Sequence, residues 1–126
     1  MKKVIFTDKA PSPIGPYSQG ILTGNTLYVS GQVALNPQTG ELEMGSIEDQ
    51  TNRVMKNLDA VLTEAGMSFA DVVKATIFIT DMDNFSRINA VYGSYFPQDY
   101  APARETVQVS RLPRNVDVEI SVIAVK

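Results

Sequence analysis

The 126-residue sequence contains no cysteine and no histidine. Without cysteine the chain has no disulfide framework, no thiol nucleophile and no thiolate ligand for a metal. Without histidine it lacks the commonest general base and the commonest metal ligand, which excludes the Ser-His-Asp triad and the zinc-hydrolase patterns. We therefore expect a metal-free site in which any catalysis depends on carboxylates, hydroxyls, arginine, lysine, backbone groups and water.

Long apolar runs and clustered positive charge are also missing. The apolar run that follows Lys2 and Lys3 covers only residues 4–6, which is too short for a signal peptide, and no stretch approaches a membrane span. The 11 basic and 14 acidic residues are scattered and give a net charge of −3, so a phosphate backbone would meet no broad basic stripe. We expect a cytoplasmic protein whose main partner is neither a membrane nor nucleic acid.

The composition is that of one ordinary globular domain. Hydrophobic residues make up 44% of the chain and charged residues 20%, and a chain of this length can bury one core without disulfides or metals. No repeat, low-complexity tract or linker interrupts it. We expect a single domain over residues 1–126.

The first recognisable element is a β-hairpin around Gly24-Asn25, between strands at 17–23 and 26–33. This turn pairs Thr23 with Thr26. Strand alternation then assigns two faces. The core face should hold Gly20, Leu22, Leu27, Val29, Gly31 and Val33. The second, mixed face should hold Tyr17, Gln19, Ile21, Tyr28, Ser30 and Gln32.

Two helices and a strand are expected in the middle of the chain. Ser46 with Asp49 is typical of a capped helix start, and Gly66 of a helix end. Between them the apolar residues follow helical spacing: Ile47, Val54, Leu58, Val61, Leu62 and Ala65. Residues 72–80 alternate as a strand, with one face formed by Val73, Ala75, Ile77 and Ile79. A second helix should begin after an N-cap at Asp83 and end before Pro97, with a buried stripe of Phe85, Ile88, Asn89, Tyr92 and Phe96.

Residues 105–111 and 116–125 read as two further strands, joined by Leu112-Pro113-Arg114-Asn115. We expect them to pair antiparallel, for instance Val109 with Val118. The core face would then hold Val107, Val109, Val116, Val118, Ile120, Val122 and Ala124. In that pairing Arg104 and Glu119 look out from the same side of the sheet.

The order of elements predicts an α+β fold with a mixed sheet of about six strands and two helices on one face. The uncovered face would then carry much apolar surface beside its polar groups, including Ile21, Tyr28, Phe78, Ile123 and Val125. That is more than a monomer leaves in water comfortably. We expect another subunit to cover this face.

Arg104 and Glu119 are the strongest candidates for chemistry. The guanidinium of Arg104 offers a planar fork that matches a carboxylate, although a surface position or an ion pair to Glu105 or Glu119 also fits the pattern. Glu119 can hold and polarise a water as a general base, or simply pair with Arg104 or a lysine. Both interpretations stay open at this point.

Three weaker candidates lie on the first hairpin. Tyr17 and Ser30 can each donate a hydrogen bond, and Gly31 can admit a ligand close to the backbone. Hydroxyls on an exposed sheet and a glycine that relieves packing explain the same residues without a site.

Four segments together resemble the RidA (YjgF) family over essentially the whole chain: residues 14–20, 28–32, 101–104 and 118–120. The resemblance implies a chorismate-mutase-like fold, a homotrimer with a central barrel, and ligand sites between subunits. It also implies 2-iminobutanoate/2-iminopropanoate deaminase activity without a cofactor. Such enzymes hydrolyse the 2-imino acids released by pyridoxal-phosphate enzymes to 2-keto acids and ammonia.

By position, the resemblance implies that Arg104 binds the substrate carboxylate and Glu119 positions the attacking water. The pocket would be shaped by Tyr17, Ser30, Gly31, Asn89 and Pro102. Thr106 is also expected to bind substrate, but it departs from the family, because the archetypal deaminases have Ser-Cys-Val after the arginine and this chain has Glu105-Thr106-Val107. The competing interpretation is a regulatory or chaperone-like trimer that binds a small carboxylate without catalysis. A ribonuclease is the weakest alternative for an acidic chain without histidine.

Overall fold

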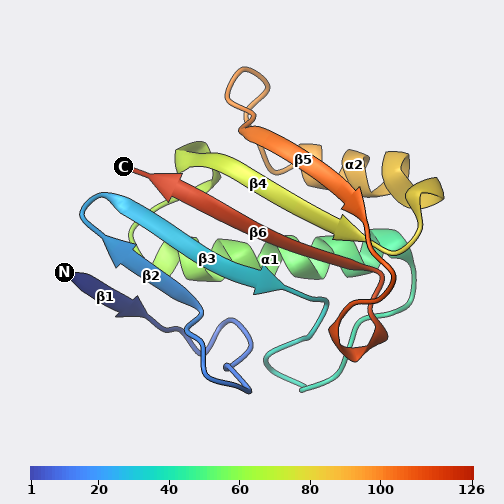
Figure 1. The fold of residues 1–126 in the computed structure, drawn as a ribbon, viewed down its shortest axis with the longest axis horizontal. Helices are drawn as coiled ribbons and strands as arrows, with labels where there is room; N and C mark the ends of the chain where they lie inside the picture. The colour runs from blue at the N-terminus through green and yellow to red at the C-terminus, as the bar shows by residue number, and fades with distance from the viewer.

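A computed structural model describes all residues 1–126. Two helices, α1 (Ile47–Glu64) and α2 (Phe85–Gly93), lie against one face of a six-stranded sheet (Figure 1). The strands are β1 (Lys2–Ile5), β2 (Gly20–Thr23), β3 (Thr26–Gln32), β4 (Val72–Ile79), β5 (Ala103–Gln108) and β6 (Val118–Val125). Their order across the sheet is β1-β2-β3-β6-β4-β5, and only the β4–β5 pair is parallel. The predicted α+β fold with a mixed sheet and two helices on one face is confirmed.

The first hairpin has the predicted register up to Val29. Thr23 pairs with Thr26, and Gly24 has the positive φ of 59° that this turn requires. Beyond Val29 a β-bulge adds one residue to β3 opposite β6, which reverses the alternation. Gln32 is therefore buried, whereas Gly31 is exposed, so the predicted core positions of Gly31 and Val33 are wrong.

Helix α1 forms where the sequence indicates. The Ser46 hydroxyl accepts a hydrogen bond from the Asp49 amide at 3.0 Å, and Gly66 follows the helix with a φ of 74°. The side chains that face the sheet are buried, among them Ile47, Val54, Leu58, Val61 and Leu62. Burial of this face against the sheet, worth about 1.5–3 kcal/mol for each fully buried aliphatic side chain, stabilises the helix far more than its caps do.

Helix α2 is shorter than predicted. A 3₁₀ turn (Met82–Asn84), capped by the Asp81 carboxylate, precedes it, so the proposed N-cap at Asp83 is wrong. Ile88, Tyr92 and Phe96 are buried as expected, but the stripe is incomplete because Phe85 is 36% exposed and Asn89 is exposed.

The predicted β5–β6 hairpin is wrong. β5 pairs parallel with β4 at the edge of the sheet, and β6 lies between β3 and β4. Residues 109–117 carry the chain past the end of β4 to the start of β6. In the centre of the sheet, β6 can form backbone hydrogen bonds along both of its edges, with β3 and with β4. Val107 consequently faces the open side, while a bulge in β4 buries Val72 and leaves Val73 48% exposed.

The two faces of the sheet differ in cover. Between sheet and helices lies the core, in which the largest fully buried side chains include Leu27, Leu58, Leu62, Ile77 and Ile120. On the open face Val4, Ile21, Tyr28 and Ile123 stand side by side on β1, β2, β3 and β6, and Val4 and Tyr28 are 58% and 49% exposed.

Neither helix combines the length and the apolar character needed to cross a bilayer.

Candidate functional site

Arg104 and Glu119 lie on opposite faces of the sheet. Arg104 pairs with Ala75 of β4, which is fully buried under the helices. Glu119 pairs with Phe78, and paired side chains point to the same side of a sheet. Because alternation places Ala75 and Phe78 on different faces, the expectation that Arg104 and Glu119 share one side is wrong. It depended on a β5–β6 hairpin that does not form.

Arg104 is held without a carboxylate partner. Its Nη1 donates to Asn89 Oδ1 at 2.5 Å, and its Cζ lies 5.0 Å from the ring centre of Tyr92 and 5.6 Å from that of Phe85. None of the three ion pairs in the structure includes Arg104. Glu105 pairs instead with Lys74 at 3.1 Å. The remaining N–H donors of a fixed guanidinium are thus free to bind an anion.

The surroundings of Arg104 include two more of the predicted residues. Asn89 accepts a hydrogen bond from the guanidinium of Arg104. It therefore shapes the pocket by holding the arginine in place. Thr106 points into the same shallow depression between β4, β5 and α2, and its buried Oγ1 has no hydrogen-bond partner. Pro102 directly precedes β5 and lines neither this depression nor the larger hollow described next.

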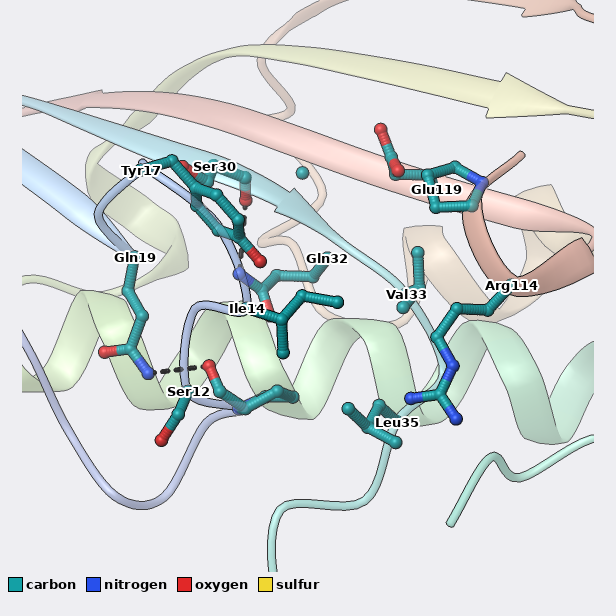
Figure 2. Close-up of a pocket in the computed structure, with 13 residues that line it drawn as sticks. Ser12, Ile14, Tyr17, Gln19, Ser30, Gln32, Val33, Leu35, Arg114 and Glu119 are labelled. Carbon is teal, nitrogen blue, oxygen red and sulfur yellow. Dashed lines mark hydrogen bonds between the residues drawn. The ribbon is translucent and has the colours of Figure 1, made fainter. Parts of the chain in front are cut away.

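The larger hollow lies on the open face and has a volume of about 410 Å³ (Figure 2). Four predicted residues line it: Tyr17, Ser30, Gly31 and Glu119. The rest of its wall comes from the proline-rich loop, the end of β3 and the turn after β5: Pro11, Ser12, Ile14, Gln19, Gln32, Val33, Leu35, Pro113 and Arg114. The structure therefore gathers one half of the predicted site here and the other half around Arg104.

Glu119 lies directly over the backbone of Gly31. A Cβ atom added to Gly31 would come within 2.6 Å of Glu119 Oε2, so only glycine leaves this carboxylate its position. No side chain or backbone group of the protein donates a hydrogen bond to Glu119, and burial raises its pKa above the ordinary value. A half-buried carboxylate without protein donors can accept a hydrogen bond from a water.

Ser30 and Tyr17 differ in what they can offer a ligand. The Ser30 hydroxyl donates to the Ser18 carbonyl at 2.6 Å, which leaves only its acceptor capacity free. Tyr17 is 51% exposed, and its hydroxyl makes no hydrogen bond within the chain and borders the hollow in Figure 2. Tyr17 therefore remains available as a donor, whereas Ser30 mainly holds the loop against β3.

Sequence reasoning missed three contributions. Gln19, predicted on the mixed face, is 2% exposed: it accepts from the Thr7 amide and donates to the carbonyls of Thr7, Ala10 and Pro11. Tyr92 supports Arg104 although it was read only as core. Arg114 lines the hollow from a left-handed turn, with a φ of 59°. The one local signal for this left-handed turn was Asn115, because asparagine adopts the left-handed conformation more readily than most residues other than glycine.

Three comparisons with known proteins bear on this arrangement. The family model described as Endoribonuclease L-PSP matches residues 7–126. A RutC family protein of Pyrococcus horikoshii is 51% identical over 126 residues, which cover 100% of this chain and 99% of that protein.

Two solved structures are similar throughout. The crystal structure of Escherichia coli TdcF with bound serine has a TM-score of 0.93 and 44% identity, and covers 98% of each chain. The provisional name of TdcF is reactive intermediate deaminase. The structure of RidA from an Antarctic Psychrobacter has a TM-score of 0.93 and 41% identity, over 98% of this chain and 99% of that one.

Proposed function

Because this chain belongs to the Endoribonuclease L-PSP (YjgF/RidA) family, we propose that it is a deaminase of reactive 2-imino acids. It converts small substrates of the 2-iminobutanoate and 2-iminopropanoate type to 2-keto acids and ammonia. The observation that carries this proposal is the free guanidinium of Arg104, which is fixed by Asn89 and two aromatic rings and has no carboxylate partner. The name of TdcF and the serine bound in its structure support a site for small compounds of the amino acid type.

The active site is built from two chains. Within one chain the sheet separates Arg104 from Glu119, so one chain cannot present both groups to one small molecule. Two chains can, if the open face of one meets the edge at β5 of the next. Repetition of this head-to-tail contact around an axis closes a ring. We take the ring to be a homotrimer whose apolar open faces line a central barrel.

The exposed apolar surface supports this association. The row of Val4, Ile21, Tyr28 and Ile123 lies on the face that no helix covers. Large apolar surfaces of this kind mark contacts with other protein chains. In the assembly the hollow of one chain then faces the Arg104 of its neighbour.

The reaction needs only positioning and proton transfer. The substrate carboxylate docks on Arg104, and Glu119 accepts a hydrogen bond from a water beside Gly31. The water oxygen forms a bond to the imine carbon, the C=N electron pair moves to nitrogen, and a carbinolamine results. Glu119 carries one proton of the attacking water to the nitrogen as the carbinolamine forms, and afterwards carries the remaining hydroxyl proton to the same nitrogen. The C–N bond then breaks as the C=O bond forms, and ammonia leaves a 2-keto acid.

A threonine dehydratase coupled to semicarbazide trapping tests this activity. The hydrolase lowers the yield of semicarbazone and speeds the appearance of 2-oxobutanoate, whereas a protein that only binds small carboxylates changes neither. The observation that favours the binding alternative is the serine bound in the TdcF structure, so the outcome of this assay decides between the two functions.

Mixing two inactive variants tests the shared site. Arg104→Ala and Glu119→Gln each remove one half, but a mixed ring contains some sites with Arg104 from one chain and Glu119 from the next. With random mixing of equal amounts, about a quarter of the sites are intact. Recovery of about that fraction of wild-type activity after joint refolding supports the two-chain site, and no recovery contradicts it. Wild type refolded in the same way is the control.

A further inference from the structure

The hollow on the open face is larger than a three- or four-carbon imino acid needs. Its volume of about 410 Å³ falls within the range that encloses drug-sized ligands. The neighbour's Arg104 and the water on Glu119 account for one end only. The proposed function assigns no part of the substrate to the other end of the hollow, which lies between Ile14, Leu35 and the turn at Pro113.

Arg114 lies at this unassigned end. Figure 2 shows its guanidinium turned toward Leu35 and away from the carboxylate of Glu119. No ion pair in the structure involves Arg114 and none of the hydrogen bonds uses its side chain. The hollow therefore contains a cation that the fold does not neutralise, beside an apolar wall of Val33 and Leu35.

The backbone that carries Arg114 is in an uncommon conformation. Arg114 and Asn115 have φ values of 59° and 58°, in the left-handed region that side chains other than glycine and asparagine rarely adopt. Contacts within the turn hold it: Arg111 Nε donates to Asn115 Oδ1 at 2.7 Å, and the Asn115 amide donates to the Leu112 carbonyl at 3.1 Å. Strained residues of this kind persist where the surroundings fix them, often beside ligands.

We propose that Arg114 binds a second anionic group on the substrate, so that the preferred substrates of this chain include 2-imino dicarboxylates. This inference rests on the proposed function for the position of the first carboxylate. The side chain of the substrate extends from the imine carbon, past the apolar wall, to the guanidinium of Arg114. A distal carboxylate gains a charge-assisted hydrogen bond there, whereas a methyl end of equal length gains none.

Two five-carbon keto acids isolate the distal charge, because 2-oxoglutarate and 2-oxopentanoate differ only in their far end. The measurement is the dissociation constant of each by isothermal titration calorimetry, and the hydrolysis rate of each corresponding imine. We expect wild type to favour the dicarboxylate by about tenfold, the discrimination of one charge-assisted hydrogen bond.

Three variants complete the test. Arg114→Asn removes the cation and suits the left-handed backbone, and should abolish the preference without loss of 2-oxopentanoate binding. Arg114→Lys keeps the charge and should retain part of the preference. Lys56→Gln removes one positive charge from the exposed side of α1, outside the hollow, and should leave the preference intact.

The outcomes separate this inference from the proposed function. If wild type hydrolyses the monocarboxylic imine but Arg114→Asn leaves the ratio unchanged, the role of Arg114 is overturned and the deaminase stands. If wild type hydrolyses neither imine but binds 2-oxoglutarate through Arg114, catalysis is overturned and the ligand class stands. Equal binding of both keto acids by wild type overturns the inference directly.

Discussion

The two faces of the sheet carry the two halves of the candidate site, and they present their charges in opposite ways. On the helix-covered face, the cation Arg104 is fixed by the amide of Asn89 and by the rings of Tyr92 and Phe85. On the open face, the carboxylate of Glu119 has no protein donor and occupies space that Gly31 leaves free. The first half is held in place and can bind an anion, while the second is a half-buried carboxylate that can accept a hydrogen bond from a water.

This difference shows why neither half suffices alone. A guanidinium on aromatic rings recognises a carboxylate but accepts no proton. A half-buried carboxylate accepts a proton but repels an anionic substrate. Their separation by the sheet stops them from neutralising each other within a chain. In the assembly proposed above they would meet only with substrate between them.

The largest effect is expected for Arg104→Ala. Loss of a buried or partly buried charge partner costs roughly 2–5 kcal/mol, so kcat/KM for 2-iminobutanoate should fall roughly 30-fold to several thousandfold. The coupled dehydratase assay measures this. Arg87→Ala is the control arginine variant, because Arg87 is exposed on α2 and pairs only with Glu48, whereas Arg104 is half-buried on β5. Near-full activity of Arg104→Ala would sink the proposed role.

Glu119→Gln should have the next largest effect, a loss of about a hundredfold in kcat, typical of a lost general base. The same variant should be more stable than wild type at pH 7. Burial raises the pKa of Glu119 in the folded state. At a pH between the unfolded and the folded pKa, the native chain therefore holds a proton that the unfolded chain has released. The stability of wild type consequently falls as the pH rises from below the unfolded pKa through the folded pKa.

Thermal melts across this pH window check the second part. The melting temperatures of wild type and Glu119→Gln should converge below the ordinary carboxyl pKa and separate above the folded one. The acid limb of the activity profile should also lie above the ordinary carboxyl pKa, because the proton acceptor must be ionised. Melting curves that stay parallel at every pH would contradict a desolvated carboxylate.

Gly31→Ala should produce a smaller loss, about tenfold in kcat. The new Cβ would lie 2.6 Å from Glu119 Oε2, and the flexible carboxylate must move by an ångström or more, a misplacement that lowers rates without unfolding the chain. Gly93→Ala is a matched control, since nothing lies within 4 Å of the corresponding Cβ. Equal activity of the two alanine variants would mean that the position of Glu119 is unimportant.

Thr106→Val should have the smallest effect, and on stability alone. The buried Oγ1 of Thr106 has no partner, so its replacement by a methyl group removes an unmet hydrogen-bonding group and should raise the free energy of unfolding by about 1 kcal/mol. Urea denaturation measures this. A large loss of activity in Thr106→Val would instead show that a ligand or the neighbouring chain uses this hydroxyl.

Local sequence patterns predicted the parts of the fold that depend on neighbouring residues, namely the first turn and the ends of α1. The Gly24-Asn25 turn set the register of the first hairpin, and Ser46 and Gly66 marked the ends of α1. The position of β5 could not be read in this way. Apolar alternation in 105–111 fits a strand beside β6 or beside β4 equally well, and the choice depends on which backbone edges find partners across the whole sheet.

The same distinction between local patterns and contacts across the sheet applies to the candidate site. Motifs indicated Arg104, Glu119 and the residues grouped with them, but not Arg114 in the wall of the hollow. The side of the sheet on which Arg104 lies was also not predicted, because the pairing expected for its strand was wrong. The bulge at Ser30 and Gly31 likewise could not be inferred from alternation, since it adds a residue only in relation to β6. The fixation of Arg104 by Tyr92 depended on how α2 approaches β5, a tertiary contact without a sequence signature.

Gln19 fixes one wall of the hollow. Its amide oxygen accepts from the Thr7 amide, and its two N–H groups are shared among the carbonyls of Thr7, Ala10 and Pro11. At about 1 kcal/mol for each hydrogen bond, their loss would cost a sizeable share of the stability of a small domain. This wall therefore does not swing aside as a gate. In the proposed trimer, substrate and product would pass between neighbouring chains, so their exchange rates should depend on fluctuations of the subunit interface rather than on the motion of this loop.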